Sequence, residues 1–107
     1  MLDVAHMAVH VGLMTSLDGM RQCFDAVTVN AARILHLDGY GIEPGCKADL
    51  VVLQAADPME AIRLKATRLL VLRRGQVIAE TAPRITRLDL PGRPAQVDLN
   101  FVPGSIR

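Results

Sequence analysis

Aromatic residues are scarce in this chain of 107 residues, which has no tryptophan, one tyrosine and two phenylalanines. Modules that stack bases rely on aromatic side chains, so this composition argues against a surface for nucleic acid. A surplus of charge is lacking too, because twelve basic and eleven acidic residues leave a formal net charge of +1. Without a long run of like charge, neither nucleic acid nor an anionic membrane is expected as a partner.

Cysteine is also sparse, and the opening segment lacks the marks of a targeting signal. Cys23 and Cys46 are the two cysteines and form no C-x-x-C motif, so we expect free thiols in a reducing cytoplasm. The apolar opening MLDVAHMAVHVGLM has no basic start and no small-residue cleavage site, and it is too short to cross a bilayer. The sequence therefore predicts a soluble, cytoplasmic protein.

The first part of the chain has helical periodicity. Residues 2–14 carry only three polar side chains, on one helical stripe, which predicts a helix that is covered from more than one side. A second helix is predicted over residues 15–27, with Ser16 among its possible caps. Thr28 is expected to break and recap the chain before a third helical stretch, which should continue to Gly39. We predict a helical segment over residues 1–38.

From residue 39 the pattern changes to turns and strands. The run ADLVVL predicts a strand buried on both faces, and DPMEAIRLK predicts a short helix in which Asp57 caps, Pro58 lies in the first turn and Glu60 completes a capping box. The run LLVLRRGQVIAE predicts a hairpin with its turn at Arg74 and Gly75.

These features predict strands with a short helix over residues 39–82, and a proline-rich tail over residues 83–107 that wraps the sheet. Three strands are few for a sheet that is buried on both faces, so we expect its neighbours to lie elsewhere.

The best local candidates for chemistry are His6 and His10, four residues apart on one helix face, with Asp3 one turn earlier. Two imidazoles and a carboxylate at this spacing could bind zinc. However, Met7 stands where the H-E-x-x-H motif has its acid, and histidines on such a stripe are more often hydrogen-bonded structural groups. Asp49, at the entrance of the predicted strand, is expected to bond local backbone amides and not to act as a catalytic acid.

Three stretches occur in the right order to suggest a family: VTVNAARILHL, YGIEPGCKADLVVL and VLRRGQVIAE. Together they resemble the C-terminal part of metal-dependent amidohydrolases. That resemblance implies an α/β fold, α+β in this piece, with the terminal helices of a (β/α)8 barrel followed by the C-terminal strands of a small β-sandwich. The fold would be incomplete here, because the first sandwich strands of this family come from the N-terminus.

Within the superfamily, MLDVAHMAVHVGL, LDGYGIEPG, DPMEAIR and VLRRGQVIAETAP are most similar to cytosine deaminase and its relatives. The resemblance implies hydrolytic deamination of a cyclic amidine such as cytosine, by water that a divalent metal, zinc or iron, activates. In the family the metal ligands include a His-x-His pair, which this sequence lacks, and an aspartate that ends the eighth barrel strand. These ligands would lie upstream, and Asp3 is not assigned to that role because it matches the following helix.

The resemblance thus implies no catalytic residue and no cofactor in this chain, which should be inactive alone and should need the N-terminal barrel and sandwich strands of a longer parent. Met1 would then be an internal methionine, and the exposed apolar surface would favour self-association. Two other hypotheses are a freestanding interaction module that dimerises without catalysis, and a minimal enzyme with a metal at His6 and His10.

Overall fold

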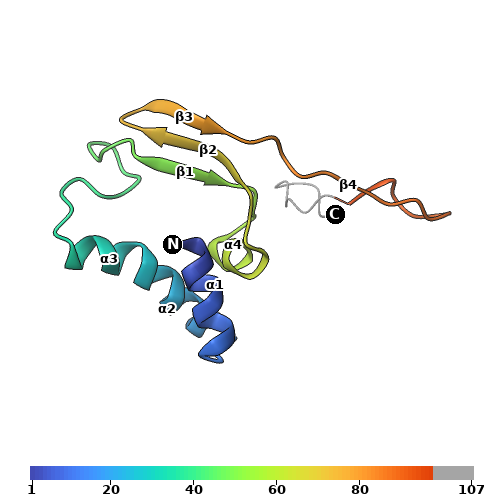
Figure 1. The fold of residues 1–107 in the computed structure, drawn as a ribbon, viewed down its shortest axis with the longest axis horizontal. Coiled ribbons are helices and arrows are strands. Elements are labelled where there is room, and N and C mark those ends of the chain that lie inside the picture. Colours follow the sequence, from blue (N-terminus) through green and yellow to red (C-terminus); the bar gives the residue numbers. More distant parts are fainter. Residues whose placement is uncertain (98–107) are drawn as a thin grey trace.

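A computed structural model describes residues 1–97. In Figure 1 the helices lie on one side of a three-stranded sheet, and a second, smaller hairpin extends away from it. None of the helices in this part of the chain is long and apolar enough to cross a bilayer. The elements in order are α1 (Leu2–Val11), α2 (Leu17–Val27), α3 (Val29–Ile34), β1 (Leu50–Leu53), α4 (Pro58–Leu64), β2 (Arg68–Arg73), β3 (Gln76–Glu80), β4 (Thr86–Arg87) and β5 (Gln96–Val97).

Helix α1 ends at Val11, three residues before its predicted end. The amide of Gly12 donates to the carbonyl of Ala8 at 2.9 Å, and a Cβ on residue 12 would lie 2.7 Å from that same oxygen. Only glycine fits such a close approach. Leu13 then takes a positive φ of 51°, which turns the chain out of the helix.

The predicted capping of α2 by Ser16 is confirmed, because its hydroxyl accepts the amide of Gly19 at 3.0 Å. Thr28 breaks the chain as expected, but its predicted capping of α3 by a side chain is wrong. Its hydroxyl instead donates to the carbonyl of Phe24 at 2.7 Å, which closes the end of α2. Helix α3 ends at Ile34, before the glycines, because His36 takes a positive φ of 51°.

Helix α4 begins as its sequence predicts. The carboxylate of Asp57 accepts the amide of Glu60 at 2.8 Å, and Pro58 occupies the first turn. The carboxylate of Glu60 accepts the amide of Ala56, one residue before the N-cap Asp57. In a standard capping box the acid would accept the amide of the N-cap residue itself.

The three-stranded sheet is antiparallel, in the order β1-β2-β3, and Leu50 pairs with Leu72. The predicted hairpin is confirmed: Arg74 and Gly75 join β2 to β3, both with positive φ, as a type I′ turn requires. The loop before β1 is fastened to this turn, because the carboxylate of Asp49 accepts the amide of Arg74 at 2.7 Å and the amide of Gly75 donates to the carbonyl of Ala48 at 3.0 Å.

The core lies among α1, α2 and α4, where the side chains of Ala5, Val9, Cys23 and Ile62 are buried and five larger apolar residues pack against them. These five are Leu2, Met14, Met20, Phe24 and Val27. The expectation that α1 is covered on more than one side is wrong within residues 1–97. The helix packs on α2 and α4 through one face, so the opposite apolar face remains exposed.

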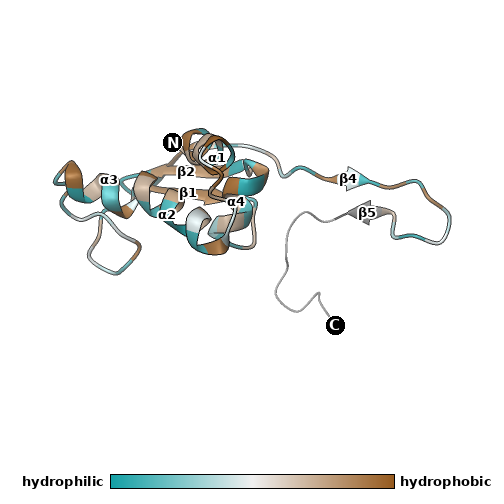
Figure 2. Cartoon of the chain, turned by 90° about the horizontal axis from the view of Figure 1, so that it is seen from below, coloured by the Kyte–Doolittle hydropathy of each residue, from teal (hydrophilic) through white to brown (hydrophobic). Residues whose placement is uncertain are grey.

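The expectation that β1 is buried on both faces is also wrong for this structure. Val51 and Val52 are 52% and 42% exposed. The physical reason is that β1 is an outer strand and no described helix packs closely against it, so both of its faces are open. In Figure 2 β1 and β2 appear as apolar ribbons beside the partly polar helices.

After Ala82 the chain leaves the three-stranded sheet, and the side chain of Gln54 binds the backbone of Arg84 just beyond that point. The side-chain amide of Gln54 donates to the carbonyl of Arg84 and its oxygen accepts the amide of Arg84, both at 2.8 Å. Strands β4 and β5 then pair and extend outward (Figure 1), so residues 83–97 do not wrap the sheet as expected. The remainder of the predicted wrapping tail, residues 98–107, lies outside the described residues.

Candidate functional site

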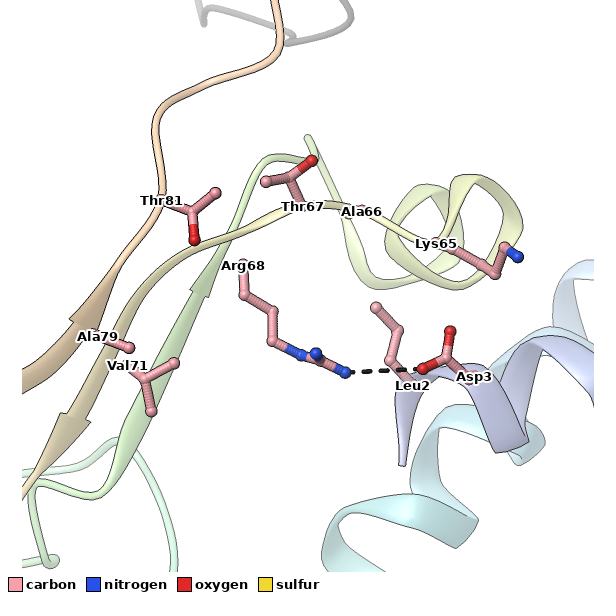
Figure 3. A pocket seen from close by; sticks show the side chains of 9 residues that line it. All are labelled: Leu2, Asp3, Lys65, Ala66, Thr67, Arg68, Val71, Ala79 and Thr81. Atoms are coloured by element: carbon pink, nitrogen blue, oxygen red, sulfur yellow. Dashed lines mark ion pairs between the residues drawn. The ribbon is translucent and has the colours of Figure 1, made fainter.

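A pocket of about 460 Å³ lies where the start of α1 meets the sheet (Figure 3). Its lining comes from the first turn of α1, the link between α4 and β2, and the inner sides of β2 and β3. The lining residues are Leu2, Asp3, Lys65, Ala66, Thr67, Arg68, Val71, Ala79 and Thr81. Of α1, only Leu2 and Asp3 line this pocket.

The pocket holds one ion pair. The carboxylate of Asp3 lies 3.7 Å from the guanidinium of Arg68, and Figure 3 shows the two side chains extended toward each other from α1 and β2. Their side chains are 72% and 52% exposed, so water screens the pair and its contribution to stability is small. The lining offers a carboxylate beside a cation but no histidine or cysteine, so it supplies neither an imidazole nor a thiolate.

The structure places His6 and His10 together, with ring centroids 4.3 Å apart and planes tilted by 45°. Nδ1 of His6 lies 2.8 Å from the carbonyl oxygen of Ile62, which ties α1 to α4. Nδ1 of His10 lies 2.8 Å from the carbonyl oxygen of His6, one turn earlier in the same helix. Both histidines therefore make the structural hydrogen bonds that were expected of the polar stripe.

The three predicted ligands do not form one cluster, because the carboxylate of Asp3 is engaged with Arg68. Within residues 1–97 there is no group of three or more His, Cys, Asp or Glu side chains that could hold a metal ion. A hydrolytic metal centre needs at least three protein ligands, so the described donors do not fit the catalytic metal of an amidohydrolase.

The other candidate residues have structural roles. Asp49 satisfies a backbone amide as expected, although its partner Arg74 lies 25 residues away and not in the adjacent turn. Cys23 and Cys46 are free thiols, as predicted. Cys23 is buried against Met14, whereas the thiol of Cys46 lies 3.8 Å from the carboxylate of Glu43.

Among the contacts that the sequence did not predict are the pairing of Arg68 with Asp3 and the two hydrogen bonds of Gln54 to Arg84. Each joins residues that lie far apart in the chain. Neither has a local signal, because hydrophobic period and turn chemistry report only on neighbours within a few positions. The hydrophilic Gln54 directly after an apolar strand is the one hint that the sequence offers.

The fold and sequence have known counterparts. A family model for the amidohydrolase family matches residues 1–79. The 5-methylcytosine deaminase of Klebsiella pneumoniae, liganded with phosphonocytosine, superposes with a TM-score of 0.72 and 35% identity over 81% of this chain and 22% of that chain. With 5-fluorocytosine bound, the TM-score is 0.73, with 34% identity over 81% of this chain and 21% of that one.

A curated relative is N-isopropylammelide isopropyl amidohydrolase from Pseudomonas sp. (strain ADP). It is 46% identical over 55 residues, which are 50% of this chain and 14% of the relative. The chain thus spans about 14% to 22% of the length of the proteins that it matches. With its mixed helices and antiparallel strands, it belongs to the amidohydrolase family and resembles cytosine deaminase.

Proposed function

We propose that this chain is the C-terminal structural part of an amidohydrolase that deaminates a cyclic amidine such as cytosine by hydrolysis of a C–N bond. The observation that carries the proposal is the superposition of 81% of the chain, at 35% identity, on about a fifth of a 5-methylcytosine deaminase. That enzyme was liganded with phosphonocytosine and with 5-fluorocytosine, which favours a cytosine-like substrate for the parent of this chain.

In this proposal α1, α2 and α3 are the terminal helices of a (β/α)8 barrel, and β1, β2 and β3 belong to a β-sandwich. Support comes from apolar side chains that have nothing to pack against in the described chain. Val4, Met7 and Val11 form an exposed stripe on α1, and Ile34 is exposed at the end of α3. Apolar surface of this extent is typical of an interface, and the N-terminal barrel and sandwich strands of the parent would cover it.

The contribution of this part to catalysis is mechanical. The bond from His6 to the carbonyl of Ile62 fastens α1 to α4, and the short link through Lys65 joins α4 to β2. The helices and the sheet are thereby connected through one small core. We propose that the groups of the reaction lie in the rest of the parent, that the family's metal is held there, and that this chain alone is inactive.

A chimera tests the proposal. The segment of the Klebsiella pneumoniae 5-methylcytosine deaminase that superposes on this chain is replaced by this chain, and ammonia release from 5-methylcytosine is measured with zinc or iron supplied. We expect the chimera to fold and deaminate, and the isolated chain to release no ammonia. Ile62→Asp serves as the matched control, because a carboxylate in the closed core should abolish assembly.

Ammonia release by the isolated chain at an enzymatic rate would contradict the proposal. So would a soluble, metal-loaded chimera without activity.

A second function, a dimerising interaction module without catalysis, is favoured by one observation. All five residues of β3 are exposed, and β3 is an outer strand of its sheet. Such a strand can pair with a copy of itself. A well-ordered dimer of the isolated chain, detected by sedimentation and by dispersed NMR spectra, would support the module over the C-terminal part.

A further inference from the structure

The orientation of both imidazoles on α1 is fixed by the backbone. A carbonyl oxygen only accepts hydrogen bonds, so Nδ1 of His6 donates to Ile62 and Nδ1 of His10 donates to His6. The neutral ring carries one N–H, which leaves the lone pair on Nε2 of each ring. Histidines that bind metal are oriented in this way, with the other ring nitrogen donating to a carbonyl or carboxylate.

The rings are close enough to share a cation. A zinc ion about 2.1 Å from both Nε2 atoms, in tetrahedral coordination, would hold the ring centroids about 5 Å apart. The observed separation is 4.3 Å, and rotation of the two side chains about their χ torsions can adjust it. His10 is exposed and His6 is half-buried, so an ion from solution can reach the pair.

We propose that His6 and His10 form a two-imidazole site for one divalent transition-metal cation. Imidazole nitrogen suits zinc, copper and nickel, whereas magnesium and calcium prefer oxygen ligands. Water fills the remaining positions. Asp3 is paired with Arg68 and is not a ligand of this site. The site is independent of the proposed deaminase function, because both of its ligands lie on α1.

Titration of the purified chain, freed of any affinity tag, with Zn²⁺ against a chromophoric chelator tests this site. All samples carry Cys46→Ser, because a thiol beside the carboxylate of Glu43 is itself a zinc ligand. We expect one Zn²⁺ per chain and a shift of both Nε2 resonances in the NMR spectrum. His10→Gln keeps a donor for the carbonyl of His6 but removes the lone pair, and should weaken binding at least about tenfold.

His36→Gln is the matched control, because His36 is exposed and lies outside the pair. This variant should bind zinc as tightly as the chain that carries Cys46→Ser alone. Circular dichroism checks that each variant keeps its helices. The proposal is overturned if the chain takes up no zinc, or if His10→Gln binds zinc as tightly as the chain that carries Cys46→Ser alone. It is also overturned if His36→Gln loses as much affinity for zinc as His10→Gln.

Discussion

Ile62 is the side chain on which the small helical core depends most. It is fully buried, and its carbonyl also accepts the hydrogen bond from His6, so one residue joins α4 to α1 through both side chain and backbone. The structural role of such a residue can be predicted from the sequence only in part. The caps of DPMEAIRLK predict the helix that carries Ile62, but no pattern in the sequence reveals which helix its side chain meets.

Replacing Ile62 with alanine should lower the free energy of unfolding by about 2–5 kcal/mol, because it removes apolar contacts and leaves a cavity. Urea denaturation followed by circular dichroism measures the change. Ile42→Ala is the control, since Ile42 is 86% exposed and its loss should cost less than about 0.5 kcal/mol. Equal effects of the two substitutions would show that the core is not built around Ile62.

Asp49 offers a second test at the scale of single residues. Its carboxylate accepts the amide of Arg74 in the hairpin turn. Asp49→Ala should lower the free energy of unfolding by about 1 kcal/mol, because that amide would then have only water as a partner. Hydrogen exchange of the Arg74 amide should accelerate correspondingly. The exposed Asp38 supplies a matched substitution, and faster exchange at Arg74 in Asp38→Ala would refute the assignment.

At the scale of elements, local chemistry determined what could be predicted. The caps Ser16 and Asp57 and the turn at Arg74 and Gly75 were predicted correctly, because each depends on residues within four positions of one another. The early ends of α1 and α3 were not predicted, because each depends on a residue that adopts a positive φ without being glycine, namely Leu13 and His36. Sequence gives little warning of that conformation.

The burial of elements was predicted less well than their type. Apolar runs such as ADLVVL indicate that a strand is meant to be covered, but they do not say by what. In the described chain no helix packs closely on either face of β1, so the composition of β1 and its exposure disagree. That disagreement is the physical signal behind the proposed assembly with a larger parent.

Asp57→Ala tests how far α4 depends on its cap. Loss of the bond to the Glu60 amide should lower the free energy of unfolding by about 1 kcal/mol, with fraying of the first turn of α4. Asp57→Asn should retain most of the stability, because an amide oxygen can still cap. Comparison of the two variants by urea denaturation distinguishes capping from charge, and equal losses would favour charge.

At the scale of the whole molecule, the chain is extended. Its radius of gyration is 16.2 Å, whereas about 13 Å is expected for a compact domain of this length. Two features contribute to this open shape. They are the pocket beside Asp3 and Arg68, and the outward hairpin of β4 and β5. A shape of this kind fits a part that is completed by other polypeptide.

We therefore expect the isolated chain to self-associate as its concentration rises, through the exposed stripe on α1. The double variant Val4→Glu/Val11→Glu should lower the weight-average mass in sedimentation, because charges on that stripe oppose burial. Leu90→Glu is the control variant, because it places a charge on an exposed apolar residue of the outward hairpin and not on α1. A strict monomer at every concentration, or an unchanged mass in the double variant, would contradict this expectation.

The clamp of Gln54 on Arg84 has a practical consequence. Because the side chain of Gln54 satisfies both polar groups of the Arg84 backbone, it marks the last point within residues 1–97 at which the chain is tied to the three-stranded sheet. A protease should accordingly cleave first beyond Ile85 and leave a trimmed product that keeps its fold. That trimmed product would be the natural choice for crystallisation.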